Sequence, residues 1–385
     1  MPRVKPVYNG FEQGPIRPPS EAASLLLRVT RNCPWNRCSF CPVYKGANFS
    51  LRPVQHVLQD IDMLSKQVAL LRKHLDVYGQ LNHRDLSQFS EGCDDNEQVA
   101  LYAAYSWLDE GVQSIFLQDA DSLVIKSGDL ICILDHIRKS FPQVKRITSY
   151  ARSQTIDRIS EVDLDRIAAA GLNRIHIGLE SGSDAVLKLV QKGADQSMHI
   201  RAGQKVKKAG MELSEYVMPG LGGRSLSQTH AVETAEALNQ INPDFIRLRT
   251  LAIPHRTELY NDWQNGDFVK MTDCEVAEEI LLLLENLEGI SSTLQSDHIL
   301  NLFQEVEGKV PQDNQAMMAV IQKFLELPAE EQMLYQVGRR LGIFVRLADL
   351  EQVANRQRVI SACHNYKITP GNVDDKIDEL MNRFI

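Results

Sequence analysis

Short apolar segments alternate with amphipathic segments between residues 24 and 251, and this alternation limits the possible folds more than any other feature of the sequence. The apolar segments have the length of β-strands, and helical periodicity fills the intervals between them. Succession of strand, helix and strand produces parallel pairing through right-handed crossovers. We therefore expect an α/β fold, a partial (β/α)6 TIM-like barrel. Its expected strands are residues 24–30, 114–117, 146–150, 174–178, 213–218 and 245–251.

Two regions depart from the alternation. Residues 53–78 and 98–108 are helical in pattern, but the segment 79–97 between them is polar and rich in turn formers. Because long structureless segments are usually functional or disordered, we expect 79–97 to be an insertion loop over the barrel. After residue 271 we expect no further strand, only a helical C-terminal extension. The expected organisation is an N-terminal segment (1–20), a core barrel (21–270) and an α-helical region (271–385) with helices near 275–287, 314–326, 330–341 and 373–384.

Composition narrows the class of protein. The net charge of -8 argues against general nucleic-acid binding, so we do not expect a nucleic acid partner. No apolar run approaches the roughly 18 residues of a membrane span, and the first residues lack the apolar core of a signal peptide. We therefore expect a cytoplasmic protein without membrane association.

Three of the seven cysteines, Cys33, Cys38 and Cys41, lie within nine residues just after the first expected strand. Clustered cysteines in a reducing compartment indicate metal ligation. A structural zinc site takes four ligands, whereas a 4Fe-4S cluster on three thiolates leaves one iron open to an exogenous ligand. The sequence favours such a cluster, and the alternative is a zinc site completed by a distant fourth ligand.

The cysteine loop resembles the cluster loop of the radical S-adenosylmethionine (radical SAM) enzymes, in which an aromatic residue, here Phe40, precedes the last cysteine. The usual spacing in that family is C-x3-C-x2-C, and this chain departs from it with C-x4-C-x2-C. Residues 176–184, His-Ile-Gly-Leu-Glu-Ser-Gly-Ser-Asp, are similar to the family's fourth strand and the cofactor-contacting segment after it. Residues 217–223 are similar to its glycine-containing turn after the fifth strand. The resemblance covers roughly residues 20–260.

The resemblance implies two cofactors, a 4Fe-4S cluster on Cys33, Cys38 and Cys41, and S-adenosylmethionine. It implies that the reduced cluster cleaves S-adenosylmethionine to a 5'-deoxyadenosyl radical, which abstracts hydrogen from an unidentified small-molecule substrate, with a reductant such as flavodoxin or ferredoxin as electron donor. It assigns no catalytic residue of the protein. The residues that it suggests for S-adenosylmethionine are Asp119 or Asp121 for the amino group, Arg152 for the carboxylate, Glu180 with Ser181 for the ribose or amino group, and Gly222 for close backbone approach to adenine.

Alternatives stay open for both function and residues. A noncatalytic iron-sulfur electron-transfer or assembly protein would need no S-adenosylmethionine pocket, so the match at 180–183 counts against it. A structural ion pair is the alternative for Arg152. Arg247 and Arg249 share one face of the last expected strand, which suits a carboxylate or phosphate and predicts an anionic substrate. Pairing of these two arginines with internal acidic residues is an equally good interpretation.

Overall fold

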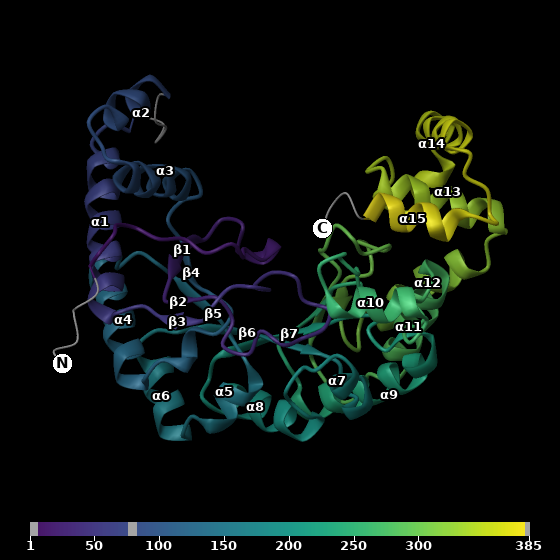
Figure 1. Cartoon of the computed structure of the whole chain (residues 1–385), viewed down its shortest axis with the longest axis horizontal. Helices are drawn as coiled ribbons and strands as arrows, with labels where there is room; N and C mark the ends of the chain where they lie inside the picture. The colour runs from purple at the N-terminus through teal and green to yellow at the C-terminus, as the bar shows by residue number, and fades with distance from the viewer. Residues whose placement is uncertain (1–6, 76–82, 382–385) are drawn as a thin grey trace. The chain divides into compact units, whose positions relative to one another are not determined.

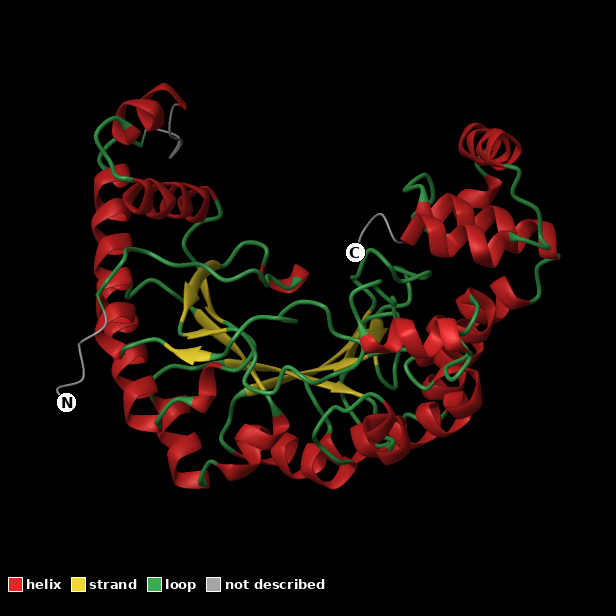
Figure 2. Cartoon of the chain, viewed as in Figure 1, coloured by secondary structure: helices red, strands yellow, loops and turns green. Residues whose placement is uncertain are grey.

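The computed structural model describes residues 7–75 and 83–381. Its strands form a mostly parallel eight-stranded sheet in the order β1-β4-β5-β6-β7-β8-β9-β10, with helices between successive strands (Figure 2). The expected α/β class with a partial barrel is confirmed, and each of the six expected strands is present. These strands are β1 (Leu25–Arg28), β4 (Ser114–Gln118), β5 (Arg146–Ala151), β6 (Arg174–Glu180), β7 (Glu212–Val217) and β8 (Phe245–Leu248).

The expectation that strands end before residue 271 is wrong. Strand β9 (Thr293–Gln295) pairs in parallel with β8, and β10 (Gly308–Lys309) pairs antiparallel with β9. In β9 only Leu294 is buried. A segment this short acquires its strand conformation from pairing with β8, which no local pattern in the sequence indicates.

The chain divides into two compact units. Unit 1 comprises Met1–Asn36, Gly46–His176 and Lys205–Glu212, and unit 2 comprises Arg37–Lys45, Ile177–Gln204 and Leu213–Ile385. This division does not follow the expected boundary at residue 270, and the three-part organisation expected from the sequence stays a prediction.

In unit 1, β1 pairs with β4 and β4 with β5, and helix α1 (Val54–Arg72) packs against α3 (Asp95–Asp109) and α4 (Ser127–Ser140) (Figure 1). Val57, Ile61 and Leu64 are fully buried, because their spacing places them on one side of α1. Two shorter helices, α5 (Ser153–Arg158) and α6 (Glu161–Ala169), follow β5.

The insertion expected at 79–97 is only in part a loop. Residues 79–82 lie outside the described residues, and His83–Ser90 form helix α2. Helix α3 begins three residues earlier than expected because Asp94 and Glu97 form a capping box, in which each side chain accepts a backbone N–H of the other residue.

In unit 2, β7 pairs with β8, and α9 (Gly223–Ile241) packs against α11 (Asp273–Glu285), which in turn packs against α12 (Asn314–Leu325). Helices α13 (Ala329–Arg340) and α15 (Val373–Met381) occur where they are expected, whereas α14 (Val353–Tyr366) is not foreseen. Helix α13 packs against both α14 and α15, as the yellow-green part of Figure 1 shows. No helix within the described residues is long and apolar enough to cross a membrane.

Candidate cluster and cofactor site

The cysteine loop starts and ends on a two-stranded ribbon in unit 1. Strand β2 (Thr30–Arg31) pairs antiparallel with β3 (Ser50–Leu51), so the chain leaves and returns at the same place. Asn32 and Asn36 both adopt a left-handed conformation, with φ of 67° and 47°. The side-chain amide of Asn32 donates to the backbone carbonyl of Asn48 at 2.6 Å, and the side-chain amide of Asn36 donates to the backbone carbonyl of Ala47 at 3.2 Å. These bonds hold the first residues of the loop to its last ones.

Cys33 lies in this first part of the loop. Its Sγ accepts the backbone N–H of Asn36 at 3.4 Å. Hydrogen bonds of this kind to the sulfur ligands are one way in which proteins tune iron-sulfur clusters. The side chain is half-buried and forms no disulfide, so its sulfur has the exposure and chemistry of a ligand.

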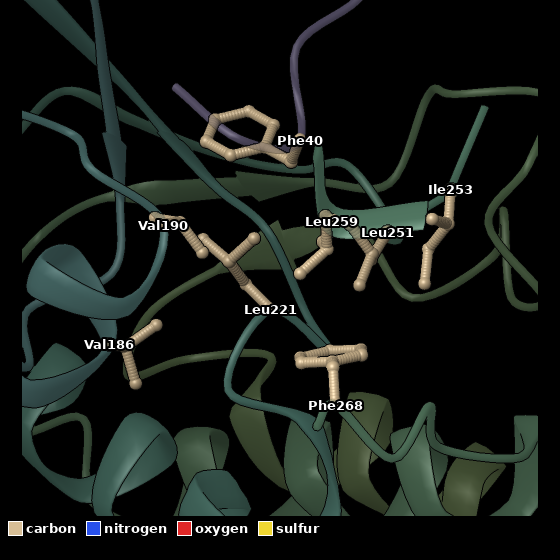
Figure 3. Close-up of a cluster of buried hydrophobic side chains, with 8 residues drawn as sticks. All are labelled: Phe40, Val186, Val190, Leu221, Leu251, Ile253, Leu259 and Phe268. Carbon is tan, nitrogen blue, oxygen red and sulfur yellow. The ribbon is translucent and has the colours of Figure 1, made fainter. Parts of the chain in front are cut away.

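Cys38 and Cys41 lie in unit 2, in a segment fixed by Phe40. The Phe40 ring is 8% exposed and belongs to a buried cluster, shown in Figure 3. Cys38 and Cys41 pack against this cluster. Just before Phe40 the backbone is bonded at both of its polar groups, since Ser39 N–H donates to the carbonyl of Val190 and the Ser39 carbonyl accepts from the N–H of Leu259, each at 3.0 Å. The other cluster members are Val186, Val190, Leu221, Leu251, Ile253, Leu259 and Phe268.

The aromatic residue before the last cysteine therefore has a clear local role. It buries its ring and holds two half-buried cysteine side chains, which form no disulfide, at the surface of an apolar cluster. Thiolates on an anchored loop suit an iron-sulfur cluster, so the residues present fit the group that the sequence predicts. Across the described residues no three or more His, Cys, Asp or Glu side chains are gathered closely enough to hold a metal ion, and the ligand set stays a prediction.

Asp119 connects β4 to the beginning of the cysteine loop. Its Oδ2 accepts from Arg28 Nε at 2.8 Å and Nη2 at 2.6 Å, and from the backbone N–H of Asn32 at 3.0 Å. Its Oδ1 is buried and has no hydrogen-bond partner among the described residues. A Cβ on Gly14 would lie 2.0 Å from Oδ1, so only glycine allows the N-terminal segment to pass this close. Asp119 thus fixes Asn32, the residue before Cys33.

Asp121 is fully buried a short distance along the chain. Its Oδ2 accepts from the Thr155 hydroxyl at 2.5 Å, and its Oδ1 is without a partner among the described residues. Burial raises the pKa of Asp121 to about 7, although the bond from Thr155 and the charge of Arg152 oppose the rise. Near neutral pH this carboxyl is therefore close to half-protonated.

Arg152 is the residue before helix α5, and it reaches the cysteine loop. Its guanidinium carbon lies 5.0 Å from the centre of the Trp35 ring, within cation–π range. Trp35 stands two residues after Cys33, and Asn32 stands one before it. Unit 1 thus brings Asp119 and Arg152, two residues predicted from the sequence to bind the cofactor, to residues that flank Cys33.

Unit 2 holds the other predicted cofactor residues. Glu180 ends β6 with φ of 62°, and its Oε1 accepts from Lys192 Nζ at 2.9 Å. The hydroxyl of Ser181 is buried and accepts the backbone N–H of Ser183 at 3.0 Å. At Gly182 a Cβ would meet the carbonyl oxygen of Glu233 at 2.4 Å, so the turn runs directly against helix α9. Glu180 is an ion-paired carboxylate and Ser181 supports its own turn.

Gly222 lies at the N-terminal end of helix α9, in a turn that two neighbouring glycines permit. Gly220 and Gly223 have φ of 86° and 59°, where other residues are strained. The N–H of Gly220 donates to Glu279 Oε1 at 2.7 Å. Burial raises the pKa of Glu279 to about 7, and His230 Nε2 lies 3.9 Å from the same oxygen.

A family model described as the Radical SAM superfamily matches residues 94–235, which include β4, β5, β6 and β7. This part of the chain is thus similar to the radical SAM superfamily. Members of this superfamily bind a 4Fe-4S cluster and S-adenosylmethionine. The matched range contains Asp119, Asp121, Arg152, Glu180 and Gly222, whereas the three cysteines precede it.

Three curated relatives are similar at low identity. A tRNA uridine(34) acetyltransferase of Methanocaldococcus infernus is 22% identical over 281 residues, 69% of this chain and 50% of that protein. The protein of the same name from Methanocaldococcus jannaschii is 21% identical over 69% of this chain and 49% of that protein. A CDK5RAP1-like protein of Oryza sativa subsp. japonica is 24% identical over 65% of this chain and 39% of that protein. The chain spans about half the length of the first two relatives.

Solved radical SAM structures are also similar, at low scores. The archaeal Elp3 of Methanocaldococcus infernus has a TM-score of 0.43 at 17% identity, covering 59% of this chain and 58% of that one. The coproporphyrinogen III oxidase HemN of Escherichia coli has a TM-score of 0.44 at 15% identity, covering 69% of this chain and 52% of that one.

Sequence reasoning missed several residues that shape this candidate site. Arg28, Glu12 and Trp35 organise the beginning of the cysteine loop, and Glu279 bonds the glycine turn. Arg28 and Asp119 are 91 positions apart, so only the pairing of β1 with β4 brings them together. For Trp35, the tryptophan inside the spacing between Cys33 and Cys38 was the available signal.

Proposed function

We propose that this chain is a radical SAM enzyme that reductively cleaves S-adenosylmethionine and uses the 5'-deoxyadenosyl radical to abstract hydrogen from a substrate. The observation that carries the proposal is the convergence of Asp119 and Arg152 on residues flanking Cys33. A noncatalytic electron carrier would need a thiolate loop but no buried carboxylate and guanidinium fixed beside it. This convergence therefore favours a loop that also receives a charged cosubstrate.

Cys33, Cys38 and Cys41 would hold the cluster, which when bound supplies one electron to the sulfonium of S-adenosylmethionine. The protein's part is to keep the thiolates in place and to exclude water. The bond from Asn36 N–H to Cys33 Sγ and the burial of Phe40 serve these two purposes.

Asp119 and Arg152 suit the two charged groups on the α-carbon of the methionine moiety. The Oδ1 of Asp119 is a buried acceptor with no partner among the described residues, as an ammonium group would require. The guanidinium of Arg152 lies against the Trp35 ring, and a planar guanidinium fork matches the geometry of a carboxylate. Asp121 offers a second, partly protonated acceptor whose pKa is raised by burial.

The experiment is anaerobic reconstitution with iron and sulfide, followed by reduction with dithionite in the presence of S-adenosylmethionine. Formation of 5'-deoxyadenosine and methionine in equal amounts is the expected result. Arg152→Gln should weaken S-adenosylmethionine binding and leave the iron content unchanged. A protein that binds a 4Fe-4S cluster but neither binds nor cleaves S-adenosylmethionine would instead be an electron carrier.

An RNA substrate is a second candidate, favoured by relatives whose names describe tRNA uridine acetyltransferases. The expectation that nucleic acid is no partner therefore has no support from these relatives. A small-molecule substrate and a reductant such as flavodoxin or ferredoxin complete the proposal. Coupling of 5'-deoxyadenosine formation to the loss of either class of substrate would decide between them.

A further inference from the structure

In unit 2, Arg247 and Arg249 share the carboxylate of a single aspartate, Asp297. Arg247 Nη1 donates to Asp297 Oδ2 at 2.7 Å, and Arg249 Nη1 donates to Asp297 Oδ1 at 2.6 Å. Arg247 belongs to β8, and Arg249 follows its last residue, so both stand near the carboxyl end of this strand. In α/β barrels that end of the strands carries the reactive groups.

Asp297 is shared by two buried guanidinium groups, each of which takes one of its carboxylate oxygens. The side chains of Arg247 and Arg249 are only 3% and 12% exposed, so water solvates them little. A buried guanidinium nitrogen that lacks an acceptor is costly, because buried charged groups are normally fully paired.

One guanidinium nitrogen of Arg249 lacks a hydrogen-bond acceptor among the described residues. Nη2 of Arg249 is buried and forms no hydrogen bond with any described residue. Its neighbour Nη1 is occupied by Asp297 and by the carbonyl of Leu248. The guanidinium also lies 4.8 Å from the centre of the Tyr216 ring, which restricts its orientation. The guanidinium of Arg249 is therefore held in place by its partners, while its Nη2 still lacks an acceptor among the described residues.

His298, the residue after Asp297, adds no charge to this group at neutral pH. Burial and the positive charge of Arg249 lower the pKa of His298 to about 4, so the ring is neutral at neutral pH. A neutral imidazole adds a hydrogen-bonding group and no further positive charge. The side chain of Asp297 is 27% exposed, so the carboxylate that the two arginines share lies at the border between the buried guanidinium groups and solvent.

We propose that Arg249, supported by Arg247 and Asp297, binds an anionic group, a carboxylate or phosphate, of a small-molecule substrate. This inference rests on the proposed function, since it assigns the substrate class of the same enzyme. Pairing with an internal acid, the alternative weighed from the sequence, is present, but it leaves Nη2 of Arg249 without an acceptor among the described residues. Recessed arginines suit a small anion better than an RNA backbone, which needs exposed basic groups.

The test measures anion binding to the anaerobically reconstituted protein by isothermal titration calorimetry. Inorganic phosphate and succinate are the probes, at fixed low ionic strength with chloride as the balancing salt. We expect saturable binding of at least one probe, and Arg249→Gln should lower its affinity at least tenfold. Preference for phosphate identifies a phosphorylated substrate, and preference for succinate a carboxylic acid. Arg356→Gln, at another arginine–glutamate pair of unit 2, is the matched control and should leave binding unchanged.

A second variant shows whether lost binding in Arg249→Gln could be explained by misfolding alone. Asp297→Asn removes the shared carboxylate and should raise anion affinity, the opposite direction from Arg249→Gln. Absence of saturable binding of both probes, or equal affinities in the parent and both variants, overturns the inference. Binding of a tRNA that Arg249→Gln weakens, with neither small anion bound, overturns it in favour of RNA. Cleavage of S-adenosylmethionine is measured on the same samples, so failure of the proposed function is seen separately.

Discussion

Arg152 stacks its guanidinium on Trp35, with 5.0 Å between the guanidinium carbon and the ring centre. The contact joins the residue before α5 to the cysteine loop, which are far apart in the sequence. A cation–π pair of this kind contributes about 0.5–2 kcal/mol, depending on its exposure. The same guanidinium can thus position the loop and face a ligand carboxylate.

The first prediction concerns the iron ligands. Cys33→Ala, Cys38→Ala and Cys41→Ala should each abolish the oxygen-sensitive 4Fe-4S cluster, because a cubane needs all three thiolates to hold three of its irons. Iron and acid-labile sulfide per chain, measured after anaerobic reconstitution, provide the readout. Cys132→Ala changes an exposed thiol and is the control. A full cluster in any of the first three variants would remove that cysteine from the ligand set.

The second prediction concerns Arg152. Arg152→Gln should weaken S-adenosylmethionine binding about tenfold or more, since a charge-assisted hydrogen bond contributes about 1.5–3 kcal/mol. Equilibrium binding to the reconstituted protein measures the change. Arg158→Gln, an exposed arginine at the other end of α5, should leave the affinity unaltered. Equal effects of the two substitutions would mean that net charge, and not the position of Arg152, controls binding.

The third prediction uses Asp121, whose pKa burial raises from 3.8 to about 7. Between these values the folded protein keeps a proton that the unfolded chain has lost, so the free energy of unfolding falls as the pH rises through this window. The decrease from this group should total roughly 2–4 kcal/mol by pH 8. Asp121→Asn should flatten that part of the profile, measured by urea unfolding at pH 5 and pH 8. An unchanged slope would show that Asp121 does not titrate there.

The fourth prediction concerns the close approach of Gly182 to helix α9. Gly182→Ala places a methyl group 2.4 Å from the carbonyl oxygen of Glu233, so the turn or the helix must move. We expect a loss of about 1–3 kcal/mol or more in the free energy of unfolding. Gly128→Ala is the control, because nothing lies within 4 Å of the added Cβ in helix α4. It should stabilise the protein by about 0.5–1 kcal/mol. Thermal unfolding of both variants tests the contrast.

The fold was largely predictable because its signal is local. Strands such as Leu25–Arg28 and Phe245–Leu248 are visible as short runs between helical patterns. Strand β9 and helix α14 were not, because their conformations depend on neighbours: β9 on pairing with β8, and α14, with only Val359 and Cys363 buried, on packing against α13. Local patterns cannot report such contacts.

Candidate-site residues that belong to sequence motifs could be predicted, whereas residues whose role depends on contacts distant in the sequence could not. The three cysteines follow from spacing and resemblance, and the face shared by Arg247 and Arg249 follows from the alternation of side chains along a strand and agrees with their common bonds to Asp297. Glu215 was missed, since it shares its face of β7 with the apolar residues Leu213 and Val217. It is fully buried, both its carboxyl oxygens lack partners among the described residues, and burial raises its pKa well above the usual range.

Because β2 and β3 are paired, the unusual cysteine spacing has almost no effect on the free energy of folding. Because Arg31 and Ser50 are paired, the chain between them is a loop whose ends are already held together. The entropy of closing such a loop grows only with the logarithm of its length, so one additional residue between Cys33 and Cys38 changes it by about 0.05 kcal/mol. A ribbon-closed loop can therefore gain or lose a residue between its first two thiols at almost no cost to folding, and spacing is a weak guide to which chains of this kind carry a cluster.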